Sequence, residues 1–131
     1  KEIKGGEKMN KLANFEAVYE KEEDMLFVYS KRNKTKESVE VMDDIVIDLD
    51  KDNNLVGIEV YDASKFFNSM DSKINEEILE KLKEVKVGIK KYRNYVFITI
   101  VFNVEGLTLS EKLPGISLRE YESPLITSVS A

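Results

Sequence analysis

The residues of this chain whose spacing could support chemistry are four carboxylates on a short stretch. They fall on positions 1, 3, 5 and 12 of a calcium-binding EF-hand loop and are Asp48, Asp50, Asp52 and Glu59. Position 6 is Asn53 instead of the glycine that bends such a loop, and the flanking residues alternate as in β-strands. A polar hairpin turn, in which Asp and Asn side chains bond to the local backbone, explains the same residues. We therefore expect a turn without a cofactor, and a calcium site is the alternative.

Paired carboxylates could also act as acid and base, as they do in glycoside hydrolysis. Asp43 adjoins a strand-like stretch, and strand alternation places Asp44, Asp48 and Asp50 on one side of it. A solvated sheet face accounts for these residues without any catalysis. We assign no catalytic residue and expect a protein that is not an enzyme; a hydrolase that uses the Asp48, Asp50 and Asp52 turn is the alternative.

Composition excludes several classes of chemistry. The 131 residues include 20 basic and 25 acidic side chains, for a net charge of −5, and there is no His, Cys or Trp. Without His and Cys there is no imidazole base, thiolate nucleophile, disulfide or ordinary zinc site. Abundant Lys and Glu without Cys is typical of thermophile proteins. The first twenty residues lack an apolar stretch, so we expect a cytoplasmic protein with no membrane segment.

The charge is unevenly spread along the chain. Residues 43–80 carry three basic and eleven acidic groups, whereas residues 81–131 carry eight basic and five acidic groups. Basic turns at residues 31–36 and 90–95 could contact phosphate, and the second adds aromatic rings. The overall negative charge argues against a nucleic-acid partner. It suits a basic protein partner better.

The first half of the chain predicts β-structure. Residues 18–30 form one strand, or two strands joined by the acidic residues 20–24, and the basic residues 31–36 form a hairpin connection. Apolar residues then alternate over 38–41, 45–49 and 55–61 with short polar connections between them. These three stretches predict an antiparallel meander.

The second half predicts two short helices and a second β segment. Asp62 can cap a helix over 63–67, and an apolar stripe predicts a helix over 74–85. Strands are expected over 86–91, 95–104 and 107–113. The fold class is therefore α+β, mostly antiparallel β-sheet, in a single domain over residues 1–131. Residues 74–113 form its helix-plus-hairpin part, residues 1–8 are expected to be a translated leader before Met9, and residues 121–131 a loosely held tail.

Two stretches carry a family likeness. The first is the aromatic, acidic and apolar segment 19–28, and the second runs from Asp44 through the Asp-x-Asp of residues 48–50 to Gly57-Ile58-Glu59 and Asp62-Ala63-Ser64. Over about residues 19–65 the chain resembles the small prokaryotic family called domain of unknown function 2283. The chain departs from that pattern at Asn53, where glycine is usual. The resemblance implies a small β-rich fold and brings no activity, cofactor or catalytic residue.

Two of the predicted strands are apolar on both sides. The residues that oppose the expected core side are Phe27, Tyr29, Tyr95, Phe97 and Val101. A sheet that is apolar on both faces must be covered on both. We predict that these residues meet a partner, most simply a second copy in a homodimer. The sequence thus predicts an interaction module that self-associates or binds a basic protein.

Overall fold

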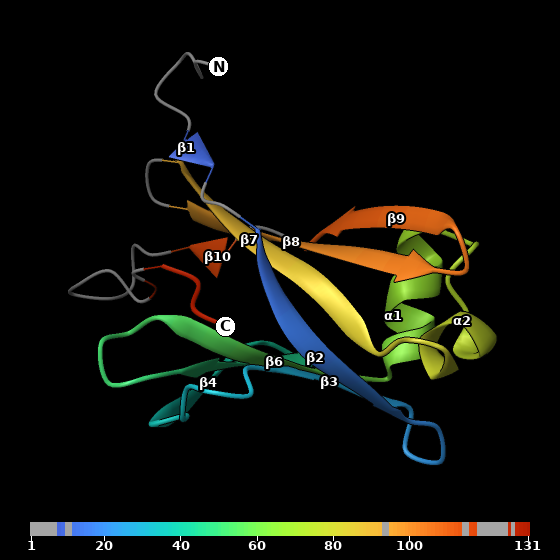
Figure 1. Ribbon diagram of the computed structural model, residues 1–131, viewed down its shortest axis with the longest axis horizontal. Helices are drawn as coiled ribbons and strands as arrows, with labels where there is room; N and C mark the ends of the chain where they lie inside the picture. Colours follow the sequence, from blue (N-terminus) through green and yellow to red (C-terminus); the bar gives the residue numbers. More distant parts are fainter. Residues whose placement is uncertain (1–7, 10–11, 93–94, 114–115, 118–125, 127) are drawn as a thin grey trace.

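The computed structural model describes residues 8–9, 12–92, 95–113, 116–117, 126 and 128–131 (Figure 1). These residues form two short helices, α1 (Ala63–Met70) and α2 (Glu76–Glu80). They also form ten strands: β1 (Lys8–Met9), β2 (Ala13–Glu20), β3 (Met25–Tyr29), β4 (Glu37–Met42), β5 (Ile45–Leu49), β6 (Leu55–Tyr61), β7 (Glu84–Tyr92), β8 (Tyr95–Val104), β9 (Leu107–Lys112) and β10 (Ile116–Ser117). The expected antiparallel sheet is therefore present and dominates the fold. The helices are short and few, so the structure supports a β-rich fold more firmly than the α+β label.

The strands form one sheet that folds over into two layers. Its order is β10-β8-β7-β2-β3-β6-β5-β4; β9 also pairs with β8, along residues 99–104, and β1 pairs with β7. Figure 1 shows β7, β8 and β9 above, in what we call the upper layer, and β3, β6, β5 and β4 below, in the lower layer. Strand β2 joins the layers, because Ala13–Glu16 pairs with β7 while Glu16–Glu20 pairs with β3. A strand that changes partners along its length is how a folded sheet turns a corner.

The core lies between the two layers. Alternate residues of each strand point inward, as the period of a strand requires. Side chains from the two layers that are at most 1% exposed include Leu26, Val28, Ile45, Ile47, Ile58, Val60, Val85, Val87, Ile89, Ile98, Ile100 and Phe102. The helices lie at one end of the layers (Figure 1), where the Phe67 ring of α1 meets Phe102 edge-on at 5.2 Å between ring centres. Each layer therefore covers the inner face of the other.

The predicted meander is confirmed in β4, β5 and β6, which are consecutive neighbours. Of the two interpretations of residues 18–30, the two-strand one is right, although β2 begins earlier, at Ala13. The prediction that residues 31–36 connect two paired strands of a hairpin is wrong. Strand β3 pairs with β2 and β6, so the chain crosses from β3 to the far edge of the lower layer at β4.

The predicted helix over 74–85 is too long. Helix α2 begins after Asn75, whose side chain accepts a hydrogen bond from the N–H of Ile78 at 3.0 Å, and it ends at Glu80. Leu82 and Val85 are buried as the apolar stripe indicated, but Val85 lies in β7 opposite Phe102. These apolar residues are buried without forming a helix, because pairing of the strand with the rest of the sheet outweighs the weak helix propensity of the segment.

The described end of the chain is attached to the sheet. Ile126 is fully buried, and Leu55 donates its N–H to the carbonyl of Ser128 at 2.7 Å. Val129 forms a parallel bridge with Leu55. The expectation of a loose tail is therefore corrected for residues 126 and 128–131. Residues 121–125 and 127 lie outside the described residues, as do residues 1–7 of the expected leader. Within the described part of the chain, no helix is long and apolar enough to cross a bilayer.

Candidate functional site

The outer face of the lower layer gathers carboxylates and aromatic rings. Cross-strand partners point to the same side of a sheet, so the register defines its rows. In the order β2, β3, β6, β5, β4 the rows are Val18/Phe27/Glu59/Val46/Glu40, Glu16/Tyr29/Gly57/Asp48/Ser38 and, shorter, Glu20/Met25/Tyr61. We call these residues the acidic face. It carries five carboxylates, and none of its strand residues is Lys or Arg.

The Asp48 side chain of this face reaches over strand β6 at Gly57. It is only 8% exposed, and its Oδ1 accepts a hydrogen bond from the Ser38 hydroxyl at 2.7 Å. Gly57 is its partner in β6, and a Cβ atom there would lie 2.6 Å from Asp48 Oδ2 and 3.1 Å from the Val28 carbonyl oxygen. The missing side chain of Gly57 thus makes the room that the Asp48 carboxylate occupies.

Glu59 forms a carboxyl pair with Asp48. Burial raises the pKa of Glu59, and a hydrogen bond with Asp48 and the charge of Asp48 raise it further. The Tyr61 hydroxyl donates to Glu59 Oε1 at 3.4 Å. A carboxyl group beside a second carboxyl holds its proton more tightly than an isolated one, which is the direction of the Glu59 shift.

Asp50 and Asp52 are not part of this pair. Asp50 Oδ1 accepts hydrogen bonds from the N–H groups of Asp52 at 2.8 Å and Asn54 at 2.9 Å. Burial acts to raise the pKa of Asp50, but these bonds outweigh it and lower the pKa. Asn53 adopts a left-handed backbone with φ of 64°, which Asn tolerates in turns. The structure thus places Asp50 in the bonds of a polar turn.

The four carboxylates of the EF-hand spacing are therefore divided between the acidic face and the turn. Among the described residues, no group of three or more Asp, Glu, His or Cys could hold a metal ion. Three residues in contact with the Asp48–Glu59 pair were not predicted from the sequence: Ser38, Gly57 and Tyr61. Gly57 and Glu59 had a signal, because both stand in the family-like Gly57-Ile58-Glu59 motif.

A second cluster joins the two ends of the family-like segment. Asp24 accepts hydrogen bonds from the Tyr19 hydroxyl at 2.6 Å and from the Ser64 N–H and hydroxyl at 2.9 and 2.8 Å. Asp24 therefore caps the first turn of α1. Asp62, the expected cap, stands at the N-cap position with φ of 52° and its side chain makes no cap hydrogen bond. This cluster fastens the β2–β3 turn to the helix and is structural.

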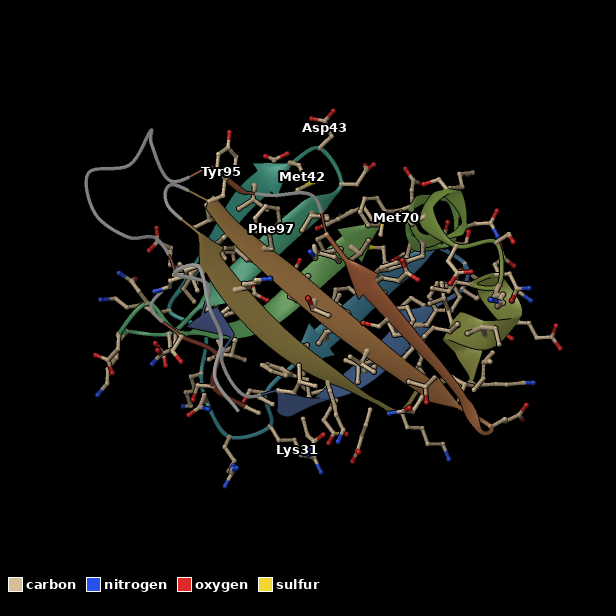
Figure 2. The ribbon with its side chains drawn as sticks, turned by 90° about the horizontal axis from the view of Figure 1, so that it is seen from above. Lys31, Met42, Asp43, Met70, Tyr95 and Phe97 are labelled. Carbon is tan, nitrogen blue, oxygen red and sulfur yellow. The ribbon has the colours of Figure 1, made fainter. Side chains whose placement is uncertain are left out.

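The outer face of the upper layer has the opposite character. Its rows, in the order β7, β8, β9, are Lys86/Val101/Ser110, Gly88/Thr99/Lys112 and, without a β9 member, Lys90/Phe97. With Tyr95, which precedes Phe97 on the same side of β8, we call these residues the basic face (Figure 2). The rings of Tyr95 and Phe97 stack at 6.3 Å between centres, and Lys112 Nζ lies 5.4 Å from the centre of the Phe97 ring.

The five predicted interface residues do not form one patch. Phe27 and Tyr29 lie on the acidic face, whereas Tyr95, Phe97 and Val101 lie on the basic face. Each face keeps exposed aromatic surface: Tyr29 is 40%, Tyr61 39% and Tyr95 42% exposed. The sequence identified residues that avoid the core, and the folding of the sheet separates them.

A groove of about 870 Å³ lies beside β2, the beginning of β7 and the end of β8. Its charged lining residues are Glu16, Lys31, Lys81, Lys83, Glu84, Lys86 and Glu105. Lys81 bonds to Glu105 at 3.3 Å. The mixture of charges gives the groove no single electrostatic preference, in contrast to the two faces.

The fold and these faces define a small β-rich protein with two chemically distinct sheet surfaces. Residues 17–64 match the model of a family described as "Protein of unknown function (DUF2283)". The match confirms the resemblance expected over residues 19–65. It spans the segment that forms β3, β4, β5 and β6, and therefore the whole lower layer and the Asp24 cluster.

Two archaeal proteins are similar to this chain. An uncharacterized protein of Methanocaldococcus jannaschii is 46% identical over 50 residues, which cover 38% of this chain and 42% of that relative, less than half its length. A Methanosarcina mazei protein named "Putative hypoxanthine phosphoribosyltransferase" is 25% identical over 111 residues, which cover 83% of this chain and 85% of that relative. No solved structure matches the chain.

Proposed function

We propose that the protein is a non-enzymatic interaction module whose acidic face binds a cationic protein surface. One observation carries this proposal: the rows of the lower layer bring Glu16, Glu20, Glu40, Asp48 and Glu59 onto one face without a basic strand residue. Carboxylates pair with Lys and Arg, and such pairs gain strength where the partner excludes water.

Aromatic rings on the same face support a cationic partner. Tyr29 and Tyr61 are about two-fifths exposed, and Phe27 lies beside them in the middle row of β3. The face of an aromatic ring attracts Lys and Arg side chains, by about 0.5–1 kcal/mol at an exposed site. Rings also bury apolar surface at the centre of an interface, where aromatic residues are enriched. The combination suits a Lys- or Arg-rich surface better than a neutral one.

The proposal is tested with a fluorescent oligolysine peptide as the cationic probe. The variant Glu20→Gln/Glu40→Gln neutralises two exposed carboxylates of the acidic face. The control Glu22→Gln/Glu23→Gln removes the same charge from the exposed β2–β3 turn, outside the face. We expect the face variant to bind at least about tenfold more weakly than the control, since tenfold corresponds to about 1.4 kcal/mol for two lost charge-assisted contacts. Equal affinities for the two variants would refute the proposal.

An enzyme that uses the Asp48–Glu59 pair is the second candidate. The raised pKa of Glu59 favours it, because a protonated carboxyl beside a second carboxyl can serve as general acid. Hydrolysis of chromogenic nitrophenyl glycosides and esters tests it. A bell-shaped pH profile that is lost in Asp48→Asn and in Glu59→Gln would support this candidate, whereas residual activity unchanged in both variants would refute it. No observation on the described residues favours the activity in the name of the Methanosarcina relative.

A further inference from the structure

We propose that the partner of the acidic face is the basic face of a second copy of this chain, so that copies associate head to tail. This inference rests on the proposed function and names its partner. The two faces are complementary in charge, in aromatic content and in their positions on the molecule.

Charge complementarity is the first argument. The three rows of the basic face contain Lys86, Lys90 and Lys112 and no carboxylate. The one carboxylate at the beginning of β7 is Glu84, and it lies opposite Glu16, where the upper layer meets the acidic face. Between two copies, rows with only basic charges would meet rows with only acidic charges. Such pairing lowers the energy of the complex and selects its orientation.

The aromatic residues supply the second argument. Lys112 already lies over the Phe97 ring within one copy, so this surface has the geometry of a cation–π contact. Across the proposed interface, lysines of the basic face would meet Tyr29 and Tyr61, while the exposed ring of Tyr95 would cover apolar surface beside Phe27 and Val46. Both faces thus combine aromatic rings with charge of one sign, and aromatic residues are enriched in protein interfaces.

Position supplies the third argument. The acidic face lies on the outside of the lower layer and the basic face on the outside of the upper layer, with the core between them (Figure 1). Figure 2 looks onto the upper layer and shows Tyr95 and Phe97 there, with the lower layer behind. A contact between unlike faces on opposite sides is heterologous, so it leaves one face of each kind free and extends to rings or open chains.

A single-stranded nucleic acid is the other ligand that a basic aromatic face could take. The net charge of −5 opposes it, because the rest of the molecule repels a polyanion. A second copy carries the same net charge, but it brings a complementary surface of limited size, whose carboxylates and rings lie directly against the lysines of the basic face.

The test uses two variants, each with one face disabled by replacing charged side chains with Gln and a Tyr with Ser. The basic-face variant is Lys86→Gln/Tyr95→Ser/Lys112→Gln, and the acidic-face variant is Glu20→Gln/Tyr29→Ser/Glu40→Gln. All six side chains are exposed, so folding should persist. Should a triple variant fail to melt cooperatively, the double variants without the Tyr→Ser change replace it. Sedimentation velocity measures the mass of each protein alone and of the mixture.

We expect the wild type to form species whose mass grows with concentration and falls as salt is raised, because salt screens exposed charges. Each variant alone should be a monomer. Their mixture should form a 1:1 complex of twice the monomer mass and nothing larger, because only one functional face of each kind remains. The control Glu22→Gln/Glu23→Gln should assemble as the wild type does.

Three results would overturn the inference. They are a wild type that stays monomeric at all concentrations, a variant that assembles alone as well as the wild type does, and a mixture that stays monomeric. Binding of a single-stranded oligonucleotide by a monomeric wild type, lost in the basic-face variant, would also overturn it in favour of nucleic acid. If oligolysine binding still depends on the acidic face in any of these cases, the proposed function stands and only the self-association fails.

Discussion

Replacing Gly57 with alanine should disturb the acidic face at Asp48. The added Cβ would lie 2.6 Å from Asp48 Oδ2, 3.1 Å from the Val28 carbonyl oxygen and 3.2 Å from Asp48 Cβ. The first contact is too short for any side chain, and the other two involve atoms tied to the backbones of β3 and β5. Asp48 must therefore move away from Ser38 and Glu59, or the strands must shift.

The size of the effect follows from these contacts. Overpacking a closely packed site costs about 1–3 kcal/mol. Loss of the hydrogen bond from Ser38 to the Asp48 carboxylate, 2.7 Å long, adds about 1 kcal/mol. Alanine returns about 0.4–1 kcal/mol by restricting the unfolded chain. The net destabilisation of Gly57→Ala should be about 2 kcal/mol, or a fall in Tm of roughly 8 °C for a chain of this size.

A double-mutant cycle of Gly57→Ala and Asp48→Ala tests whether the contact with Asp48 causes this destabilisation. Urea unfolding measures the stability of each variant. In the Asp48→Ala background the 2.6 Å contact is gone, so the cost of Gly57→Ala should fall below about 1 kcal/mol, a magnitude that small residual contacts allow. Gly106→Ala is the matched control: its φ of +82° strains any side chain, nothing lies within 4 Å of its Cβ, and its cost should be the same in both backgrounds. A Gly57→Ala cost that is also unchanged in both backgrounds would show that Asp48 does not depend on the space left by Gly57.

Further predictions concern charges, metal and core. Hydrogen bonds outweigh burial and lower the pKa of Asp24, so its stabilisation is present at neutral pH and lost as pH falls through that pKa; Asp24→Asn should cost about 2 kcal/mol at pH 7 and much less near pH 3 in urea unfolding. Burial and Asp48 raise the pKa of Glu59, so the wild type should lose stability as pH rises through that pKa; melts across that range should be flatter for Glu59→Gln, and parallel curves would contradict this. Millimolar calcium should leave the Tm unchanged, because Asp50 is engaged by its turn, and a rise in Tm would favour the calcium alternative instead. Phe67→Ala should cost about 3–5 kcal/mol in urea unfolding, and a loss below about 1 kcal/mol would contradict its place in the core.

Local alternation predicted much of the fold because the period of a strand is visible over a few residues. The stretches at residues 45–49, 55–61 and 95–104 were predicted with the bounds that the structure shows. Pairing between distant strands was not visible in this way. Residues 31–36 follow β3 directly and suggested a hairpin, but β3 pairs with β6, and that contact depends on long-range burial of Val28 against Ile58. Helix α2 is short for the same reason, since Val85 gains more by pairing with Phe102 in the sheet.

The candidate site was likewise predicted in part from the sequence and decided in part by the pairing of distant strands. The carboxylates were evident from their spacing, yet linear spacing grouped Asp48 with Asp50 and Asp52. The register of β5 against β6 instead places Asp48 opposite Gly57 and beside Glu59. A shift by one residue would turn each of these side chains to the other face.

By itself the sequence determined the absence of imidazole and thiol side chains, the net charge of −5 and the alternation of apolar and polar residues in the strands. These depend only on residue types and near neighbours. Tertiary structure alone decided which residues share a surface, because β2 pairs with β7 along its first half and with β3 along its second half, and the sheet folds at that point. The fold turns the carboxylates with Tyr29 to one side and the lysines with Tyr95 to the other.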